Sequence, residues 1–208
     1  MLRAASTISV ALALSTSVSA IPVTQTRRST ACGFNSVFGV PSFTLLATNK
    51  NDTSVRRPLV LSVVPGVAPG VSVLVTQDTV ADPIGSNFTM VSGLITSFPF
   101  GSSPDQQTSN LVPDANTFLT FSSPGTVPAE ASGASYCEYF NTSPHGTTFP
   151  YGLGVNGTPD EYSLCSSLEV PDVDVVVFNA IEGATMTPFS YDTCVPVDVN
   201  VITPGLTF

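Results

Sequence analysis

The stretch TCVPVDVNVI, residues 193–202, decides the fold. Four valines, at positions 195, 197, 199 and 201, alternate with residues that include Asp198 and Asn200. Successive side chains of a β-strand point to opposite faces, so this period of two predicts a half-buried strand. The valines should face a core, and Asp198 and Asn200 should face away from it.

The same signal recurs in shorter pieces along the chain. Residues 173–178 (VDVVVF) form a nearly continuous apolar run, which is typical of a strand covered on both faces. Val71–Thr76 alternates, and Ser92-Gly93 separates two apolar runs in the manner of a hairpin turn. Further strands are predicted at 43–47, 59–64, 88–91, 94–98, 117–121, 134–140, 151–155 and 162–165, with loops at 99–116 and 122–133.

The fold class expected from this pattern is all-β. The chain has 15 glycines and 18 prolines, and no segment shows an apolar period of 3.6 residues. About eleven or twelve strands with no helices between them predict a single-domain antiparallel β-sandwich or an irregular barrel. A β-trefoil is the alternative, although three repeats of similar length do not align.

The N-terminus has the features of an exported protein. Residues 1–20 begin with Arg3, continue with a short apolar run and end with Val18-Ser19-Ala20, which predicts a cleaved signal peptide. The apolar run is shorter than the ~20 residues that a membrane span needs. Arg27-Arg28 is a dibasic pair, so residues 21–28 are either a propeptide or a loose tail, and the domain covers 29–208.

The charge of the chain excludes several classes of partner. The full sequence has 6 basic and 15 acidic residues and a net charge of −9. Removal of Arg3, Arg27 and Arg28 with the leader leaves three basic and fifteen acidic residues. The net charge of the domain is then 3 − 15 = −12. Such a surface repels phosphate backbones and anionic lipids, so neither nucleic-acid binding nor binding to an anionic membrane surface is expected. No membrane span is expected either, because the apolar run of the leader is too short. The same charge favours solubility in a secreted protein.

An even number of cysteines behind a signal peptide predicts two disulfides. Three pairings are open from the sequence, and we favour the one that joins Cys137 to Cys165 and the first cysteine to the last. Two disulfides of this kind would hold the domain together outside the cell. The four cysteines are Cys32, Cys137, Cys165 and Cys194.

Asn-x-Ser/Thr sequons predict N-glycosylation of one or more surface loops. One or two sequons are also expected by chance in a chain so rich in serine and threonine. The sequons begin at Asn51, Asn87, Asn141 and Asn156.

Catalytic and metal signatures are weak. His145, the only histidine, titrates near neutrality when unperturbed, but it lies between Pro144 and Gly146, as a turn residue would. No Gly-x-Ser-x-Gly elbow accompanies it, so an enzyme is less expected than a non-enzyme. One histidine excludes multi-histidine zinc and copper sites, and no Asp-rich calcium loop is present. We therefore expect no metal and no cofactor.

The aromatic residues offer one binding hypothesis. The chain has no tryptophan, so a carbohydrate platform would depend on tyrosines, which cluster around the histidine. The alternative interpretation places these tyrosines on strand edges and in the core. The candidate ligand-binding set is Tyr136, Tyr139, His145, Tyr151 and Tyr162.

Several short motifs carry a resemblance to a known group of proteins. They are Tyr136-Cys137, SPHG at 143–146, YGL at 151–153, VNG at 155–157, YSLC at 162–165, TCVPV at 193–197 and FTL at 43–45. With these motifs the chain resembles small secreted proteins of fungi, of the basidiomycete type. It is also distantly similar to fungal cell-wall glycoproteins of the phialide type. The resemblance implies an extracellular or wall-associated protein and carries over no active-site residue.

Together these features predict a secreted, disulfide-stabilised glycoprotein of the fungal cell surface or wall with a structural or interaction role. Wall polysaccharide or other surface proteins would be its partners. A carbohydrate-binding, lectin-like module is the first alternative. A secreted hydrolase is the second.

Overall fold

The computed structural model describes residues 36–37, 39–98, 106–109, 113–123, 136–140, 151–155, 161–185 and 187–205. Within these ranges the chain is almost entirely β-strand, apart from one 3-10 turn, η1 (Gln77–Thr79). The predicted signal peptide, the 21–28 segment, Cys32, Asn141, His145 and Asn156 lie outside the described residues.

The described residues form fourteen strands, and all their pairings are antiparallel. Their bounds are β1 (Ser36–Val37), β2 (Gly39–Asn49), β3 (Arg56–Ser62), β4 (Val71–Thr76), β5 (Asn87–Val91), β6 (Leu94–Phe98), β7 (Gln107–Ser109), β8 (Thr117–Phe118), β9 (Thr120–Ser122), β10 (Tyr136–Phe140), β11 (Tyr151–Val155), β12 (Tyr162–Ser167), β13 (Asp174–Phe178) and β14 (Phe189–Ile202).

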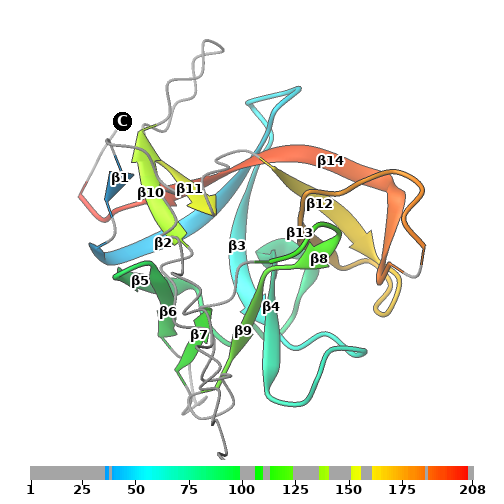
Figure 1. Ribbon diagram of the computed structural model, residues 1–208, viewed down its shortest axis with the longest axis horizontal. Coiled ribbons are helices and arrows are strands. Elements are labelled where there is room, and N and C mark those ends of the chain that lie inside the picture. The colour runs from blue at the N-terminus through cyan, green and yellow to red at the C-terminus, as the bar shows by residue number, and fades with distance from the viewer. Residues whose placement is uncertain are drawn as a thin grey trace, which may run out of the picture.

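The pairings close a nine-stranded antiparallel barrel with additional strands (Figure 1). The barrel runs in the order β14-β12-β13-β4-β9-β7-β6-β5 and returns through β2 to β14. Strand β3 pairs with both β2 and β4, and it therefore also closes a smaller ring of β2, β3, β4, β13, β12 and β14. Of the predicted architectures, the irregular barrel is confirmed.

Strand β14 is the longest and joins three parts of the fold, because it pairs with β2, β11 and β12. The predicted valine face is confirmed at positions 197, 199 and 201, each at most 2% exposed. The expectation for Asn200 is wrong, since its side chain is fully buried. Gly152 of β11 pairs with Asn200 along the edge of β14, and the Asn200 amide donates to the Thr48 hydroxyl at 2.9 Å.

The core has two parts, which lie on opposite faces of β3, β4, β12 and β13. The inner cluster fills the barrel and includes Val176 and Phe178 of β13. The outer cluster includes Val175 and Val177 of the same strand and is capped by Phe189. The prediction that residues 173–178 are covered on both faces is therefore confirmed. Each fully buried aliphatic side chain of this kind contributes about 1.5–3 kcal/mol.

The predicted hairpin turn is present between β5 and β6. Ser92 and Gly93 both have positive φ angles, 52° and 79°. Two successive residues in this region are the signature of the type I′ turn, whose twist matches that of paired strands. The turn therefore sets the register of the β5–β6 pair, in which Val91 faces Leu94.

Candidate functional site

Two of the tyrosines predicted to bind ligand lie inside the protein. Tyr136 and Tyr162 are each 1% exposed. The Tyr136 hydroxyl lies 2.9 Å from that of Ser109, whereas the Tyr162 hydroxyl has no hydrogen-bond partner in the described part of the chain. Burial raises the pKa of Tyr136 to about 12 and the pKa of Tyr162 well above its ordinary value. Neither ring can stack on a sugar in this fold, so the core interpretation holds for both.

The other two described tyrosines of the set are half-buried on β10 and β11. The Tyr139 ring covers Gly152 on the neighbouring strand, where any Cβ would overlap it. The Tyr151 ring packs edge-on against Phe140, with 5.9 Å between the ring centroids. Since His145 lies outside the described residues, the structure does not bring the predicted set together as one exposed platform.

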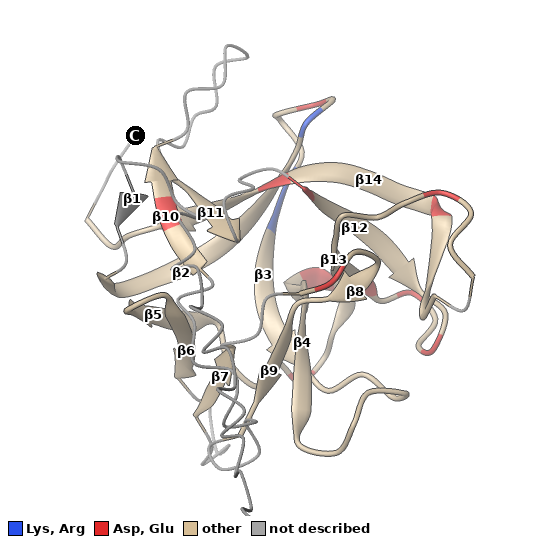
Figure 2. Ribbon diagram, viewed as in Figure 1, with Lys and Arg blue, Asp and Glu red and all other residues tan. Residues whose placement is uncertain are grey.

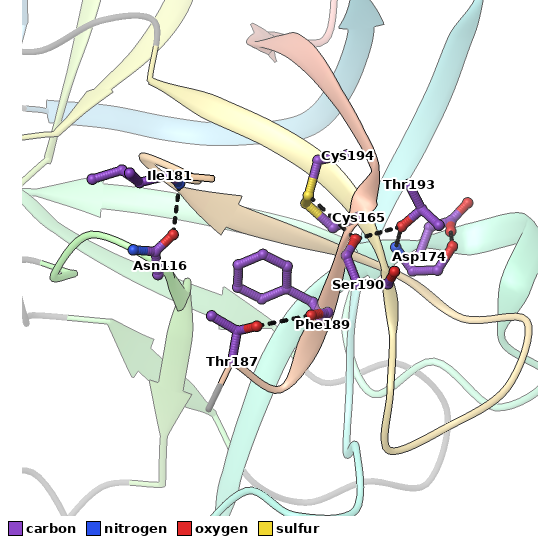
Figure 3. The surroundings of a disulfide bond; sticks show 10 residues. Asn116, Cys165, Asp174, Ile181, Thr187, Phe189, Ser190, Thr193 and Cys194 are labelled. Atoms are coloured by element: carbon purple, nitrogen blue, oxygen red, sulfur yellow. Dashed lines mark hydrogen bonds between the residues drawn. A yellow bond between two sulfur atoms is a disulfide. The ribbon is translucent and has the colours of Figure 1, made fainter. Parts of the chain in front are cut away.

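The cysteine pairing differs from the favoured prediction. Cys165 of β12 is bonded to Cys194 of β14 (Figure 3), so the pairings Cys137–Cys165 and Cys32–Cys194 are wrong. The strand order explains the difference, because β12 lies beside β14 whereas β10 lies beside β1 and β11. Cys137 is also disulfide-bonded, and Cys32 is the one cysteine of the sequence that remains.

Two of the four predicted glycosylation sites fall on described residues. Asn51 is exposed in the turn between β2 and β3, where the Asn49 side-chain oxygen accepts its backbone N–H at 2.8 Å. Asn87, the first residue of β5, is also exposed. Both side chains are therefore accessible to modification.

A cavity of about 110 Å³ opens at one end of the smaller ring. Its floor consists of Ala47, Leu164 and Val197, which are buried members of the inner core. Because side chains alternate along a strand, the next inward-facing positions toward the end of the ring include Asn49 on β2 and Val195 on β14. We call this site the barrel mouth. Mouths of barrels are common places for small-ligand sites.

The barrel mouth has a polar side made of an ion network. Arg57 donates from Nε and Nη2 to the Asp78 carboxylate at 2.9–3.2 Å, and from Nη1 to the Asp174 carboxylate. Asp174 also accepts from the Ser166 hydroxyl at 3.1 Å. Burial is the largest single influence on Asp78 and opposes its ionisation. The hydrogen bonds and charge of Arg57, together with hydrogen bonds from Thr76 and the Asp78 backbone, outweigh it and hold the pKa of Asp78 below its ordinary value. The fork of Arg57 thus fixes both carboxylates in place.

Another part of the wall is an irregular segment of β14. Ser190 pairs with Ser166 and Val195 pairs with Leu164, so residues 191–194 of β14 lie against the single residue Cys165 of β12. We call residues 191–194 the β14 bulge. Bulges are recurrent next to binding sites, where they redirect side chains.

The β14 bulge is held by two kinds of bond (Figure 3). The Thr193 hydroxyl donates to the Ser190 carbonyl at 2.7 Å and accepts the Ser166 backbone N–H at 2.8 Å. The disulfide joins the end of the bulge, Cys194, to β12. Thr193 and Val195, which flank Cys194, are therefore fixed where they line the cavity.

Sequence reasoning missed the barrel mouth, although a signal for it exists. Arg57 lies two residues before Leu59 on β3, and Asp174 lies two residues before Val176 on β13. Each charged side chain therefore points to the same face of its strand as that apolar residue. Leu59 and Val176 both belong to the inner core. A charged residue on the same face of the same strand, placed at the strand end, therefore indicates a polar opening of the barrel. The Asp174 side chain lines the barrel mouth.

Two further findings apply to the described residues. No group of three or more histidine, cysteine or acidic side chains there is arranged to hold a metal ion. No helix in that part is long and apolar enough to cross a bilayer.

Comparison with known proteins gives no match for the chain among protein-family models, curated proteins or solved structures.

Proposed function

We propose that this chain is a secreted glycoprotein of the fungal cell surface or wall with a structural or interaction role. The observation that carries the proposal is the Cys165–Cys194 disulfide between neighbouring strands of a closed barrel, together with a disulfide-bonded Cys137. Disulfides form and persist in oxidising compartments, which are chiefly the secretory pathway and the cell exterior. A barrel held in this way suits a protein that works outside the cell.

Surface features support the same conclusion. Acidic residues are spread over strands and loops, whereas the described basic residues, Lys50, Arg56 and Arg57, lie at the β2–β3 hairpin (Figure 2). The exposed sequons at Asn51 and Asn87 are available to the glycosylation machinery. The resemblance to small secreted fungal proteins and the signal-like N-terminus point the same way.

Secretion of the full chain from a yeast host tests the proposal. We expect the protein in the medium or the wall fraction, with faster migration on gels after N-glycosidase treatment and slower migration after reduction. Thr53→Ala, which removes the Asn51 sequon, should lose one glycan, whereas the matched Thr53→Ser variant should keep it. Retention of an unglycosylated, reduced protein inside the cell would contradict the proposal.

A carbohydrate-binding module is the second candidate function. The tyrosine platform no longer supports it, because Tyr136 and Tyr162 are buried. The observation that favours it is the barrel mouth, which combines an apolar floor with fixed hydrogen-bonding side chains. A pull-down of the purified protein with insoluble wall polysaccharide tests this role, and absence of the protein from the pellet would remove it.

A further inference from the structure

We propose that the barrel mouth binds one unit of a neutral, polyhydroxylated ligand, such as a terminal sugar residue. This inference rests on the second proposed function and does not depend on secretion. It assigns the ligand site to Asn49, Arg57, Asp174, Thr193 and Val195, and not to the tyrosines.

The size of the cavity limits the ligand. A volume of about 110 Å³ equals that of roughly four water molecules in the liquid. It can therefore receive one end of a small molecule but not an oligosaccharide. Binding would replace those waters by fixed protein groups, which is favourable where the ligand reproduces their hydrogen bonds.

The charges at the barrel mouth disfavour an anionic ligand. Arg57 is bonded to two carboxylates, so it does not offer a free cation to an anionic ligand, and one cation against two carboxylates leaves a net charge of −1. The Asp174 carboxylate already accepts hydrogen bonds from Arg57 and Ser166, which weakens its attraction for a cation. The domain charge of −12 that follows from the sequence adds a general repulsion of anions.

The chemistry of the walls favours a hydroxyl-rich ligand with an apolar face. Asn49 carries an amide that can donate, and the Asp174 carboxylate can accept, so both partners of a sugar hydroxyl are present. Val55 and Val195 also line the cavity and are 44% and 36% exposed, which leaves aliphatic surface for the C–H face of a ring. No aromatic side chain is among the lining residues, so the affinity should be in the millimolar range.

The β14 bulge gives an independent reason to regard this cavity as a built site. A regular β14 would continue the ladder with β12 through residues 191–194 instead of leaving it. Residues of the bulge do not pair with β12 in a regular ladder. A disulfide and the two hydrogen bonds of Thr193 hold the bulge instead. The result of this irregular arrangement is that Thr193 and Val195 line the same cavity as Asp174 and Arg57.

The test is a titration of the purified, disulfide-intact protein with glucose, mannose, galactose and N-acetylglucosamine, followed by NMR chemical shifts. Methylamine and acetate serve as the cationic and anionic probes. We expect at least one sugar to shift resonances of the lining residues with a millimolar dissociation constant, and neither small ion to bind more tightly. Shifts confined to other regions, or tighter binding of an ion, would overturn the inference.

Val195→Phe should fill the opening and weaken sugar binding at least about tenfold. Val63→Phe is the matched control, because Val63 is 62% exposed and does not line the cavity. Thermal unfolding of both variants checks that they are folded. If the protein sediments with wall polysaccharide and Val195→Phe sediments equally well, the site is wrong while carbohydrate binding stands. If neither polysaccharide nor any monosaccharide binds, both proposals fall.

Discussion

Replacement of Tyr162 by phenylalanine should make this protein more stable. The Tyr162 hydroxyl is buried without a hydrogen-bond partner in the described part of the chain, and such a group costs about 1–3 kcal/mol. The ring packs against Phe178 with 5.9 Å between centroids, and phenylalanine would keep that contact. Removal of the hydroxyl also leaves a small void, so we expect a net gain of about 1 kcal/mol.

Tyr136→Phe is the matched control and should have the opposite sign. The Tyr136 hydroxyl is hydrogen-bonded to Ser109, which is only 2% exposed. The variant would lose that bond and leave the Ser109 hydroxyl buried without its partner. This should lower the free energy of unfolding by about 1–3 kcal/mol. The two variants remove the same atom from the same residue type in one core.

Urea unfolding at pH 7 measures both changes, with equal m-values as the check that compactness is unaltered. In thermal unfolding each kcal/mol should appear as a shift of about 2–4 °C for a domain of this size. A loss of stability in both variants would refute the reasoning, because it would mean that the Tyr162 hydroxyl is satisfied in the folded protein.

Three further variants test other parts of the structure. The double variant Cys165→Ala/Cys194→Ala opens a link between residues 29 apart and should lose about 3.5 kcal/mol in urea unfolding; a loss below ~1 kcal/mol would show that the strand pairing alone holds the bulge. Gly152→Ala should cost about 1–3 kcal/mol because its Cβ meets the Tyr139 ring, and most of that cost should vanish in a Tyr139→Ala background. Burial raises the pKa of Glu138, so its ionisation opposes folding as pH rises through the folded-state pKa. Glu138→Gln should therefore be more stable than the parent at pH 7 and equal to it near pH 3, and a constant difference across that range would count against the assignment.

Local patterns predicted those parts of the fold that depend on local chemistry. Val71–Thr76 and Tyr151–Val155 have the predicted bounds, and the turn at Ser92-Gly93 forms because a serine and a glycine can adopt two successive positive φ angles. The first part of β14, from Phe189, was missed. Its alternation is interrupted by the bulge, and only contacts with β12 make those residues part of a strand.

The candidate site could not be predicted in the same way, because it is a property of several strands at once. Arg57 and Asp174 are 117 residues apart and meet only when β3 and β13 join the same ring. The disulfide was mispredicted for the same reason, since the order of strands in the barrel differs from their order in the chain. The sequence left open whether Tyr136 and Tyr162 bind a ligand or lie in the core, and in the structure their rings fill the core.

The place of β14 in the chain has a consequence for biosynthesis. Among the described strands it comes last in the chain, yet it forms the seam between β2, the second of them, and β12. While a ribosome is still making the polypeptide, β2 and β12 have no partner along that seam, and Cys165 has no Cys194 to bond. The barrel therefore closes only when the final strand has emerged, and a nascent chain stalled before residue 189 would expose two open edges to chaperones.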